Sequence, residues 1–142
     1  GARVCCGGSR AAGFRTALFA EPTVLDGVTP DMEIAREETF GPVVPVVEIG
    51  SAEQALELTN ASPFGLTAAV FTEDLERGLA FAERARAGWV NINASTNLWE
   101  SHLPFGGRSG SVSGRGRVGG RYAMETFTEP KTVVYPAPRY GT

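Results

Sequence analysis

Residues 36–42 read REETFGP and place two carboxylates beside an aromatic ring and a Gly-Pro turn. A carboxylate can accept hydrogen bonds from both hydroxyls of a vicinal diol such as a ribose, and an aromatic face excludes water from a flat ring beside it. The segment therefore has the parts of a nucleotide site. Taken alone, it is more typical of a solvated turn whose Phe40 lies in the core.

A second group of candidate residues surrounds the segment LPFGG at residues 103–107. It lies just beyond a predicted strand, where open α/β sheets bind their ligands. Trp99 and Phe105 either line an apolar pocket or pack this loop onto the core, and both interpretations stay open. His102 is the sole histidine. The sequence places no carboxylate, Ser or Cys partner beside it, so we expect a surface or packing role.

Residues 114–120 read GRGRVGG, which contains the Gly-x-Gly-x-x-Gly spacing of dinucleotide-binding folds. That pattern binds a pyrophosphate only when a buried strand precedes it, a helix follows it and an acidic residue lies about 20 positions on. The preceding residues are polar and flexible, and the distal segment PAPRYGT has no carboxylate. We therefore predict a glycine-rich loop between two ordered elements rather than a cofactor site.

Cysteine usage is confined to the adjacent Cys5 and Cys6 in ARVCCGG. Neighbouring cysteines cannot cross-link distant parts of a fold, so we expect two reduced thiols on an early strand of a cytoplasmic protein. The sequence shows no metal-binding cluster, and we predict no metal site. The first residue is Gly, from which we expect a processed chain or an excerpt of a longer one.

Length, composition and net charge limit the classes of protein to which the chain can belong. The 142 residues are 42% hydrophobic with a net charge of -3, which is typical of a globular chain without a general attraction to nucleic acid. An arginine-rich stretch lies within 101–124, but it lacks interleaved aromatic residues, which favours a solvated loop over an RNA site. No apolar run approaches the roughly 20 residues of a membrane span, and we expect no membrane association.

The middle of the chain alternates strand and helix signals. We predict strands at 42–49 (PVVPVVEI), 67–71 (TAAVF) and 89–93 (WVNIN). The first helix begins at Ser51 with Gln54 completing a capping box, presents Ala52, Ala55, Leu56 and Thr59 on one face, and ends within 60–65. The second is capped by Thr72, presents Leu75, Leu79, Ala82 and Ala85, and ends by Gly88.

This order predicts an α/β core made of two consecutive crossover units in one parallel sheet, with the strand at 42–49 covered on both faces. Pro45 then marks a bulge or an unpaired N–H. Flanking elements are predicted as a strand at 19–25, a helix within 118–127 and an extended segment at 131–135.

Five motifs in succession resemble the last third of an aldehyde dehydrogenase. They are EETFGPVVPV, NASPFGLTAAVFT, RAGWVNIN, LPFGG and TFTEPKTV, in the order and near the spacing found in that family. The resemblance implies part of a doubly wound parallel-sheet catalytic domain at residues 1–127 and an oligomerisation strand and tail at 128–142. It also implies a homodimer or homotetramer.

The resemblance assigns roles to residues at matching positions. Glu38 is expected to bind the nicotinamide ribose of NAD or NADP, and Phe40 to pack beside the nicotinamide. Phe105 is expected near the aldehyde substrate, with Leu98 and Trp99 as a wall of the substrate tunnel, although ASTNLWESH does not align residue for residue. The GRGRVGG segment then connects to the last helix.

The resemblance also implies that the catalytic nucleophile is missing. The family uses a cysteine thiolate that attacks the aldehyde, and a glutamate that activates water. Cys5 and Cys6 lie in RVCCGG, which does not match the nucleophile loop. We therefore expect no catalytic residue in this chain and no activity from it alone. Two functions remain: part of an NAD(P)-dependent aldehyde dehydrogenase, or a non-catalytic remnant that folds and associates.

Overall fold

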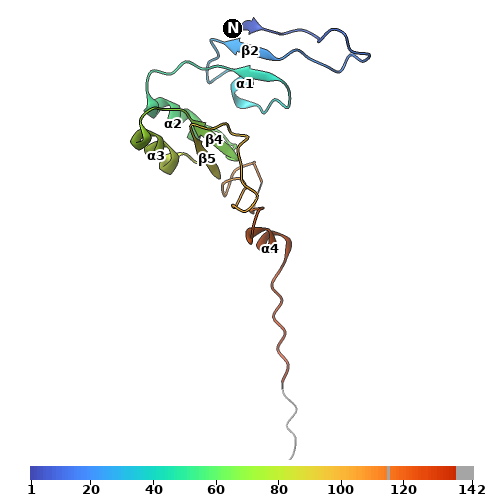
Figure 1. Ribbon diagram of the computed structural model, residues 1–142, viewed down its shortest axis with the longest axis vertical. Helices are drawn as coiled ribbons and strands as arrows, with labels where there is room; N and C mark the ends of the chain where they lie inside the picture. The colour runs from blue at the N-terminus through green and yellow to red at the C-terminus, as the bar shows by residue number, and fades with distance from the viewer. Residues whose placement is uncertain (115, 137–142) are drawn as a thin grey trace, which may run out of the picture. The chain divides into compact units, whose positions relative to one another are not determined.

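A computed structural model describes residues 1–114 and 116–136, which fall into two compact units. The first unit is Gly1–Ser62 and the second is Pro63–Thr142. Figure 1 shows the helices and strands of each unit. Both units contain parallel strand pairs and helices, so the predicted α/β class is confirmed.

The first unit is built on a three-stranded sheet. Its strands are β1 (Arg3–Cys6), β2 (Thr23–Asp26) and β3 (Val43–Pro45), in that spatial order. β1 pairs antiparallel with β2, and β2 pairs parallel with β3. The strand expected at 19–25 therefore begins later than predicted. Pro22 has no N–H for the ladder, and the residues before it pair instead with the segment near residue 10, where Ala11 N donates to Phe19 O at 2.9 Å.

The strand expected at 42–49 is reduced to the three residues of β3. Two parts of the prediction are wrong for the described residues: β3 does not share a sheet with the strand at 67–70, and its faces are not both covered. Val44 is 57% exposed. Pro45 occupies the last paired position, opposite Leu25, and Val46 N donates to Leu25 O at 2.8 Å, so the nitrogen of Pro45 faces away from β2 and its missing N–H costs no bond of this ladder. A doubly wound sheet remains a prediction for the whole protein.

Two helices complete the first unit. α1 (Glu33–Arg36) is a single turn just before the REETFGP segment, and α2 (Ala52–Ala61) has the predicted N-terminal cap. The Ser51 hydroxyl accepts from Gln54 N at 3.1 Å, and the Gln54 side chain accepts from Gly50 N at 2.7 Å. Leu56, on the predicted apolar face, is buried. The predicted cap at Ser51 is confirmed, but Gln54 reaches Gly50 N instead of the Ser51 N–H of a capping box.

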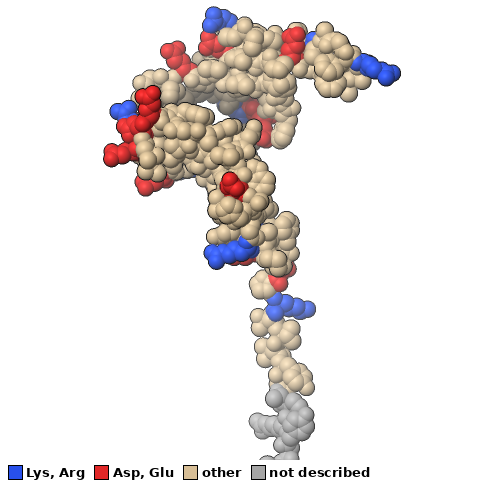
Figure 2. All heavy atoms as spheres, in the orientation of Figure 1, with Lys and Arg blue, Asp and Glu red and all other residues tan. Residues whose placement is uncertain are grey.

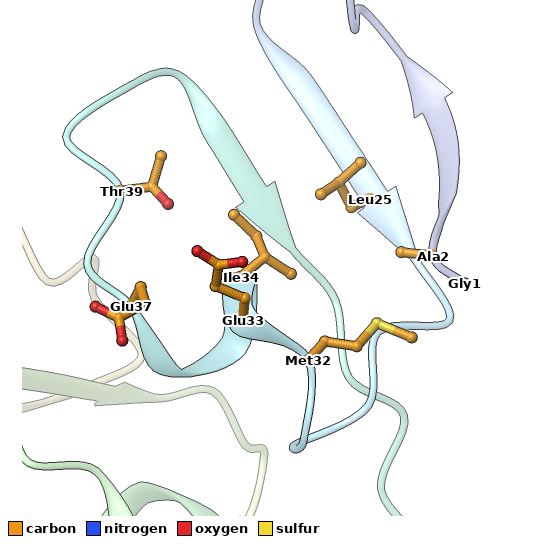
Figure 3. A pocket seen from close by; sticks show the side chains of 8 residues that line it. All are labelled: Gly1, Ala2, Leu25, Met32, Glu33, Ile34, Glu37 and Thr39. Carbon is orange, nitrogen blue, oxygen red and sulfur yellow. The ribbon is translucent and has the colours of Figure 1, made fainter.

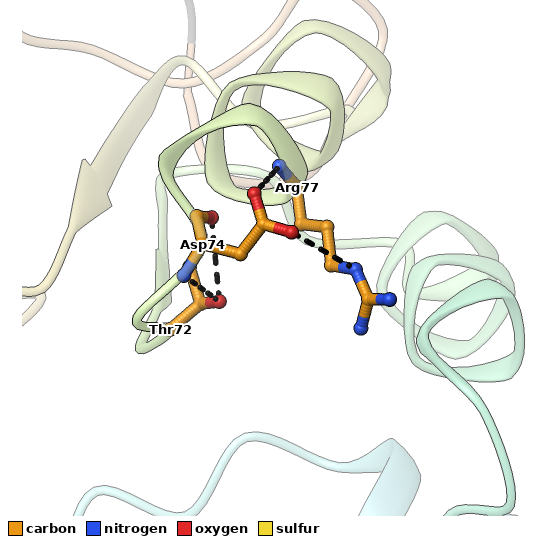
Figure 4. Close-up of polar contacts among 3 residues, drawn as sticks. All are labelled: Thr72, Asp74 and Arg77. Carbon is orange, nitrogen blue, oxygen red and sulfur yellow. Dashed lines mark hydrogen bonds and ion pairs between the residues drawn. The ribbon is translucent and has the colours of Figure 1, made fainter.

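The second unit contains one crossover of strand, helix and strand. β4 (Thr67–Val70) and β5 (Trp89–Ile92) pair parallel, and α3 (Leu75–Arg84) connects them and packs against both (Figure 1). The cap of α3 is Asp74 rather than Thr72 (Figure 4). Asp74 Oδ1 accepts from Arg77 N at 3.1 Å, while the Thr72 hydroxyl accepts from Asp74 N and orders the preceding turn.

The buried face of α3 agrees only in part with the predicted apolar stripe, of which Ala82 and Ala85 are half-buried. Leu75 and Leu79 remain at least half exposed, and Gly78 is the buried residue of the helix. A Cβ added at Gly78 would lie 3.0 Å from Ile92 Cγ2 and 3.2 Å from Thr72 Cγ2. The missing side chain lets the helix approach β5 closely, and this contact sets which face turns inward.

The C-terminal helix α4 (Tyr122–Phe127) is shorter than the predicted span, because Val118 forms an isolated antiparallel bridge with Phe105. Within the described residues after α4, no strand forms, and Val133, Val134 and Tyr135 are at least 77% exposed. The space-filling view shows the end of the described chain as mostly uncharged (Figure 2).

Apolar burial is sparse throughout the described chain. Val28 and Leu56 are its only fully buried hydrophobic side chains. No helix in the described ranges is both long and apolar enough to cross a bilayer.

Candidate functional site

Glu38 and Phe40 lie in the connection between α1 and β3. Both are exposed, and the Phe40 ring is 94% accessible. The alternative that Phe40 is a core side chain is therefore wrong for this structure. Among the residues that the structure describes, the Glu38 carboxylate forms no ion pair or hydrogen bond. The connection thus presents a free acceptor and a bare aromatic face, two residues apart.

An open hollow of about 560 Å³ adjoins this connection within the first unit (Figure 3). Its apolar side chains include Leu25 of β2, Ile34 of α1 and Met32, the residue before α1, and its carboxylates are Glu33 and Glu37. Glu37, not Glu38, lines the hollow. The two neighbouring glutamates therefore occupy different surroundings, a distinction that the sequence does not reveal.

Three aromatic rings of the second unit lie in contact. The Trp99 and Phe105 ring centroids are 5.6 Å apart, and Trp89 adds a third ring 5.9 Å from Phe105. Leu98 and Trp99 are each 52% exposed, while Phe105 is half-buried. Trp99 and Phe105 thus form an apolar wall that Trp89 contacts, and Leu98, the neighbour of Trp99 in the chain, is the third residue predicted for it.

Asn91, which the sequence analysis did not single out, organises this wall from the centre of β5. It is buried, and its amide makes three hydrogen bonds. Oδ1 accepts from the indole Nε1 of Trp89 at 2.7 Å, and Nδ2 donates to the carbonyls of Ser95 at 2.7 Å and Leu98 at 2.9 Å. A polar residue at the centre of an otherwise apolar strand was the available sequence signal.

The GRGRVGG segment supports the same wall from its other end. Phe105 and Val118 exchange two backbone hydrogen bonds of 2.8 Å, and Arg117 Nη1 donates to the carbonyls of Gly106 and Gly107, the latter at 2.8 Å. A Cβ at Gly119 would lie 2.2 Å from Leu103 O, so only glycine fits there. Residue 115 lies outside the described residues. The described part of the motif packs against LPFGG, which agrees with a connecting loop.

The remaining chemical groups are dispersed. His102 is exposed, and the Glu100 carboxylate lies 3.9 Å from its Nδ1, a neighbour that the sequence analysis did not place. Cys5 and Cys6 are exposed free thiols on β1, as predicted for an early strand. Nowhere in residues 1–114 or 116–136 do three or more His, Cys, Asp or Glu side chains form a group able to hold a metal ion.

One ion pair joins β1 to β2 at the edge of the sheet. Arg3 and Asp26 lie opposite each other in the antiparallel register, and the Arg3 guanidinium donates to the Asp26 carboxylate. This hydrogen bond, together with one from Gly27 N, holds the pKa of Asp26 below its ordinary value. The pair is exposed, so its contribution depends on salt.

Comparison with known proteins identifies the family. The model of the aldehyde dehydrogenase family matches residues 1–133. The benzaldehyde dehydrogenase YfmT of Bacillus subtilis (strain 168) is 44% identical over 115 residues, which cover 81% of this chain and 23% of that protein. Retinaldehyde dehydrogenase 3 of Homo sapiens is 44% identical over 133 residues, covering 94% of this chain and 25% of that protein.

The fold comparison agrees. The crystal structure of a Mycobacterium tuberculosis aldehyde dehydrogenase complexed with NAD+ matches with a TM-score of 0.85 at 38% identity, covering 96% of this chain and 27% of that one. The chain spans about a quarter of the length of the curated relatives it matches. With the family model matched over residues 1–133, the chain belongs to the aldehyde dehydrogenase family.

Proposed function

We propose that this chain is the C-terminal part of an NAD(P)+-dependent aldehyde dehydrogenase that oxidises an aldehyde to a carboxylic acid. The observation that carries the proposal is the family match over residues 1–133 in a chain that spans about a quarter of its relatives. In this proposal, residues 1–127 complete the catalytic domain and residues 128–142 form the oligomerisation strand and tail. A cytoplasmic location stays a prediction.

Glu38 and Phe40 are the proposed contacts to the cofactor. The residues present fit a nicotinamide ribose: Glu38 offers a carboxylate without an ion-pair partner among the described residues, and Phe40 offers an uncovered ring two positions on. The carboxylate accepts hydrogen bonds from the ribose hydroxyls, and the ring shields the nicotinamide from water. When bound, the oxidised nicotinamide supplies the hydride acceptor of the reaction.

The choice between NAD and NADP stays open in this proposal. The Mycobacterium tuberculosis relative was solved as an NAD+ complex, which supports a nicotinamide cofactor for this chain. Glu38 and Phe40 would contact the nicotinamide half, which the two cofactors share. The residues that distinguish the adenosine 2′-phosphate are proposed to lie elsewhere in the protein.

Leu98, Trp99 and Phe105 are the proposed contacts to the aldehyde. The Trp99 and Phe105 rings are in contact, and Leu98 and Trp99 are half exposed, so these apolar side chains can exclude water from a bound hydrocarbon group. Cys5 and Cys6 have no catalytic role in this proposal. The nucleophilic cysteine that attacks the aldehyde, and the glutamate that activates water, would come from the part of the protein outside this chain.

Association with further copies forms the last part of the proposal, as a homodimer or homotetramer paired through residues 131–135. The high exposure of Val133, Val134 and Tyr135 supports it, because apolar side chains of an extended segment are stabilised by a partner. The same observation favours the second candidate function, a non-catalytic remnant that associates with full-length relatives.

A kinetic experiment on the complete enzyme separates the two candidates. The complete enzyme is assayed for aldehyde-dependent formation of NADH and NADPH, with the carboxylic acid product identified by mass spectrometry. Equal amounts of acid and reduced cofactor support the dehydrogenase. A complete protein that binds neither cofactor and oxidises no aldehyde, yet forms a stable complex with an active relative, would support the remnant instead.

A further inference from the structure

Leu98 and Trp99 cannot be held in place by burial alone, because about half of each side chain is exposed. Burial of a whole apolar side chain contributes only about 1.5–3 kcal/mol even when complete, and here it is incomplete. The position of this wall therefore depends on what holds the backbone of residues 95–107. Two side chains outside that loop do so, one at each end.

Asn91 holds the first end. Its Nδ2 donates to Ser95 O and Leu98 O, and Ser95 O also accepts from Leu98 N at 3.0 Å, so both carbonyls of one tight turn converge on a single amide. The assignment of the amide is internally consistent. The indole N–H of Trp89 can only donate and the two carbonyls can only accept, so Oδ1 must face the indole.

Arg117 holds the second end. Its Nη1 donates to the carbonyls of Gly106 and Gly107, the two residues that directly follow Phe105. Arg117 is half-buried, and a Cβ at Gly88 would lie 2.7 Å from the same nitrogen. The guanidinium therefore occupies a space that the glycine at position 88 leaves open.

We propose that Asn91 and Arg117 are positioning residues for the aldehyde site, holding the Leu98, Trp99 and Phe105 wall in its binding arrangement without touching the substrate. The inference rests on the proposed function. Loosening either end should lower the fraction of enzyme whose wall can bind the aldehyde, and so weaken aldehyde binding. Cofactor binding on Glu38 and Phe40 should be unaffected.

Asn91→Asp tests the first end in the complete enzyme. The carboxylate still accepts from the Trp89 indole but no longer donates to either carbonyl. Asn93→Asp, one residue past the end of β5, is the matched control. The amide of Asn93 accepts from Thr72 N at 2.7 Å and donates to Thr72 O at 2.8 Å, away from the loop. If the wall is competent about a tenth of the time in Asn91→Asp, the apparent affinity for the aldehyde falls about tenfold.

Arg117→Met tests the second end, with Arg121→Met as its control. Arg121 is exposed, and its guanidinium lies over the Tyr122 ring, 5.1 Å from the ring centroid, away from Gly106 and Gly107. Arg117→Lys keeps one donor group and should recover part of the loss, because an ammonium can reach one carbonyl but not replace the planar guanidinium. The Arg117 variants test the positioning role even if Asn91→Asp does not fold.

Two readouts decide the inference. Steady-state kinetics should show KM for the aldehyde raised about tenfold in Asn91→Asp and Arg117→Met, with the Kd for NAD(P)+ unchanged. Hydrogen exchange should become faster in the peptide spanning 95–107, and not in either control. If exchange or KM stays at the wild-type value in both variants while the wild type oxidises aldehydes, the positioning role is refuted and the proposed function is not. A wild-type enzyme that oxidises no aldehyde refutes the proposed function, and the positioning role falls with it.

Discussion

Replacing Glu38 by Gln should weaken cofactor positioning without disturbing the fold. The side chain is exposed and has no ion-pair partner in the described ranges, so the substitution removes no contact of the folded chain. Hydrogen bonds to a charged acceptor contribute about 1.5–3 kcal/mol, and each 1.4 kcal/mol corresponds to about a tenfold change. We therefore expect a loss of roughly tenfold to a hundredfold in hydride transfer or in affinity for NAD(P)+.

The adjacent Glu37 provides a matched control for this experiment. Glu37→Gln makes the same chemical change one residue away, at a side chain that lines the hollow beside α1 instead. The assay is single-turnover formation of NAD(P)H by the complete enzyme, with cofactor affinity measured separately by titration. Normal rate and normal affinity in Glu38→Gln would refute the cofactor role, as would an equal loss in Glu37→Gln.

Three further predictions follow from single contacts. Phe40→Ala should lower hydride transfer in the same direction as Glu38→Gln with an unchanged melting temperature, because the ring is 94% exposed; a large loss of thermal stability would contradict this. Gly88→Ala places a Cβ 1.8 Å from Gly106 O and should lower the free energy of unfolding, measured in thermal melts, by about 3 kcal/mol. Gly50→Ala is the control, because its Cβ meets only Gln54 Oε1 at 3.6 Å, and it should leave the free energy of unfolding nearly unchanged. Because Arg3 lowers the pKa of Asp26, their pair stabilises the β1–β2 ladder at pH values above the ordinary pKa of a carboxyl group, and the stabilisation is lost as the pH falls through the lowered pKa. The midpoint of the Asp26 titration, followed by NMR, should move to higher pH in Arg3→Gln. Equal midpoints in the two proteins would disprove the pairing.

Local signals in the sequence predicted the helices better than the strand partners. The α2 cap depends on Ser51 and Gln54, which are close in the chain, so its geometry could be read directly. The cap of α3 was assigned two residues too early, because Thr72 and Asp74 are both good caps and the sequence does not reveal that Thr72 Oγ1 accepts from Asp74 N. Membership of a sheet depends on distant residues. The sequence therefore did not reveal that β3 pairs with β2, rather than with the strand that follows it.

In the candidate site too, neighbouring motifs were easier to predict from the sequence than contacts that form only on folding. Trp99 and Phe105 could be placed together from the order of their motifs, and their rings do meet. Asn91 was missed because its role depends on two carbonyls four and seven residues on, which return to the strand only in the folded chain. The stripe predicted for α3 was right only in part: Ala82 and Ala85 are half-buried, whereas Leu75 and Leu79 are exposed and Gly78, whose missing side chain allows a close approach to β5, is buried.

The central claim is that this chain supplies cofactor and substrate contacts to an aldehyde dehydrogenase whose nucleophile lies elsewhere. The most direct measurement is aldehyde-dependent NAD(P)H formation by the purified 142-residue chain and by the complete enzyme under the same conditions. We predict activity from the complete enzyme and none from the chain alone. Robust activity from the chain alone, lost on Cys5→Ser or Cys6→Ser, would contradict the account by placing the nucleophile in this chain.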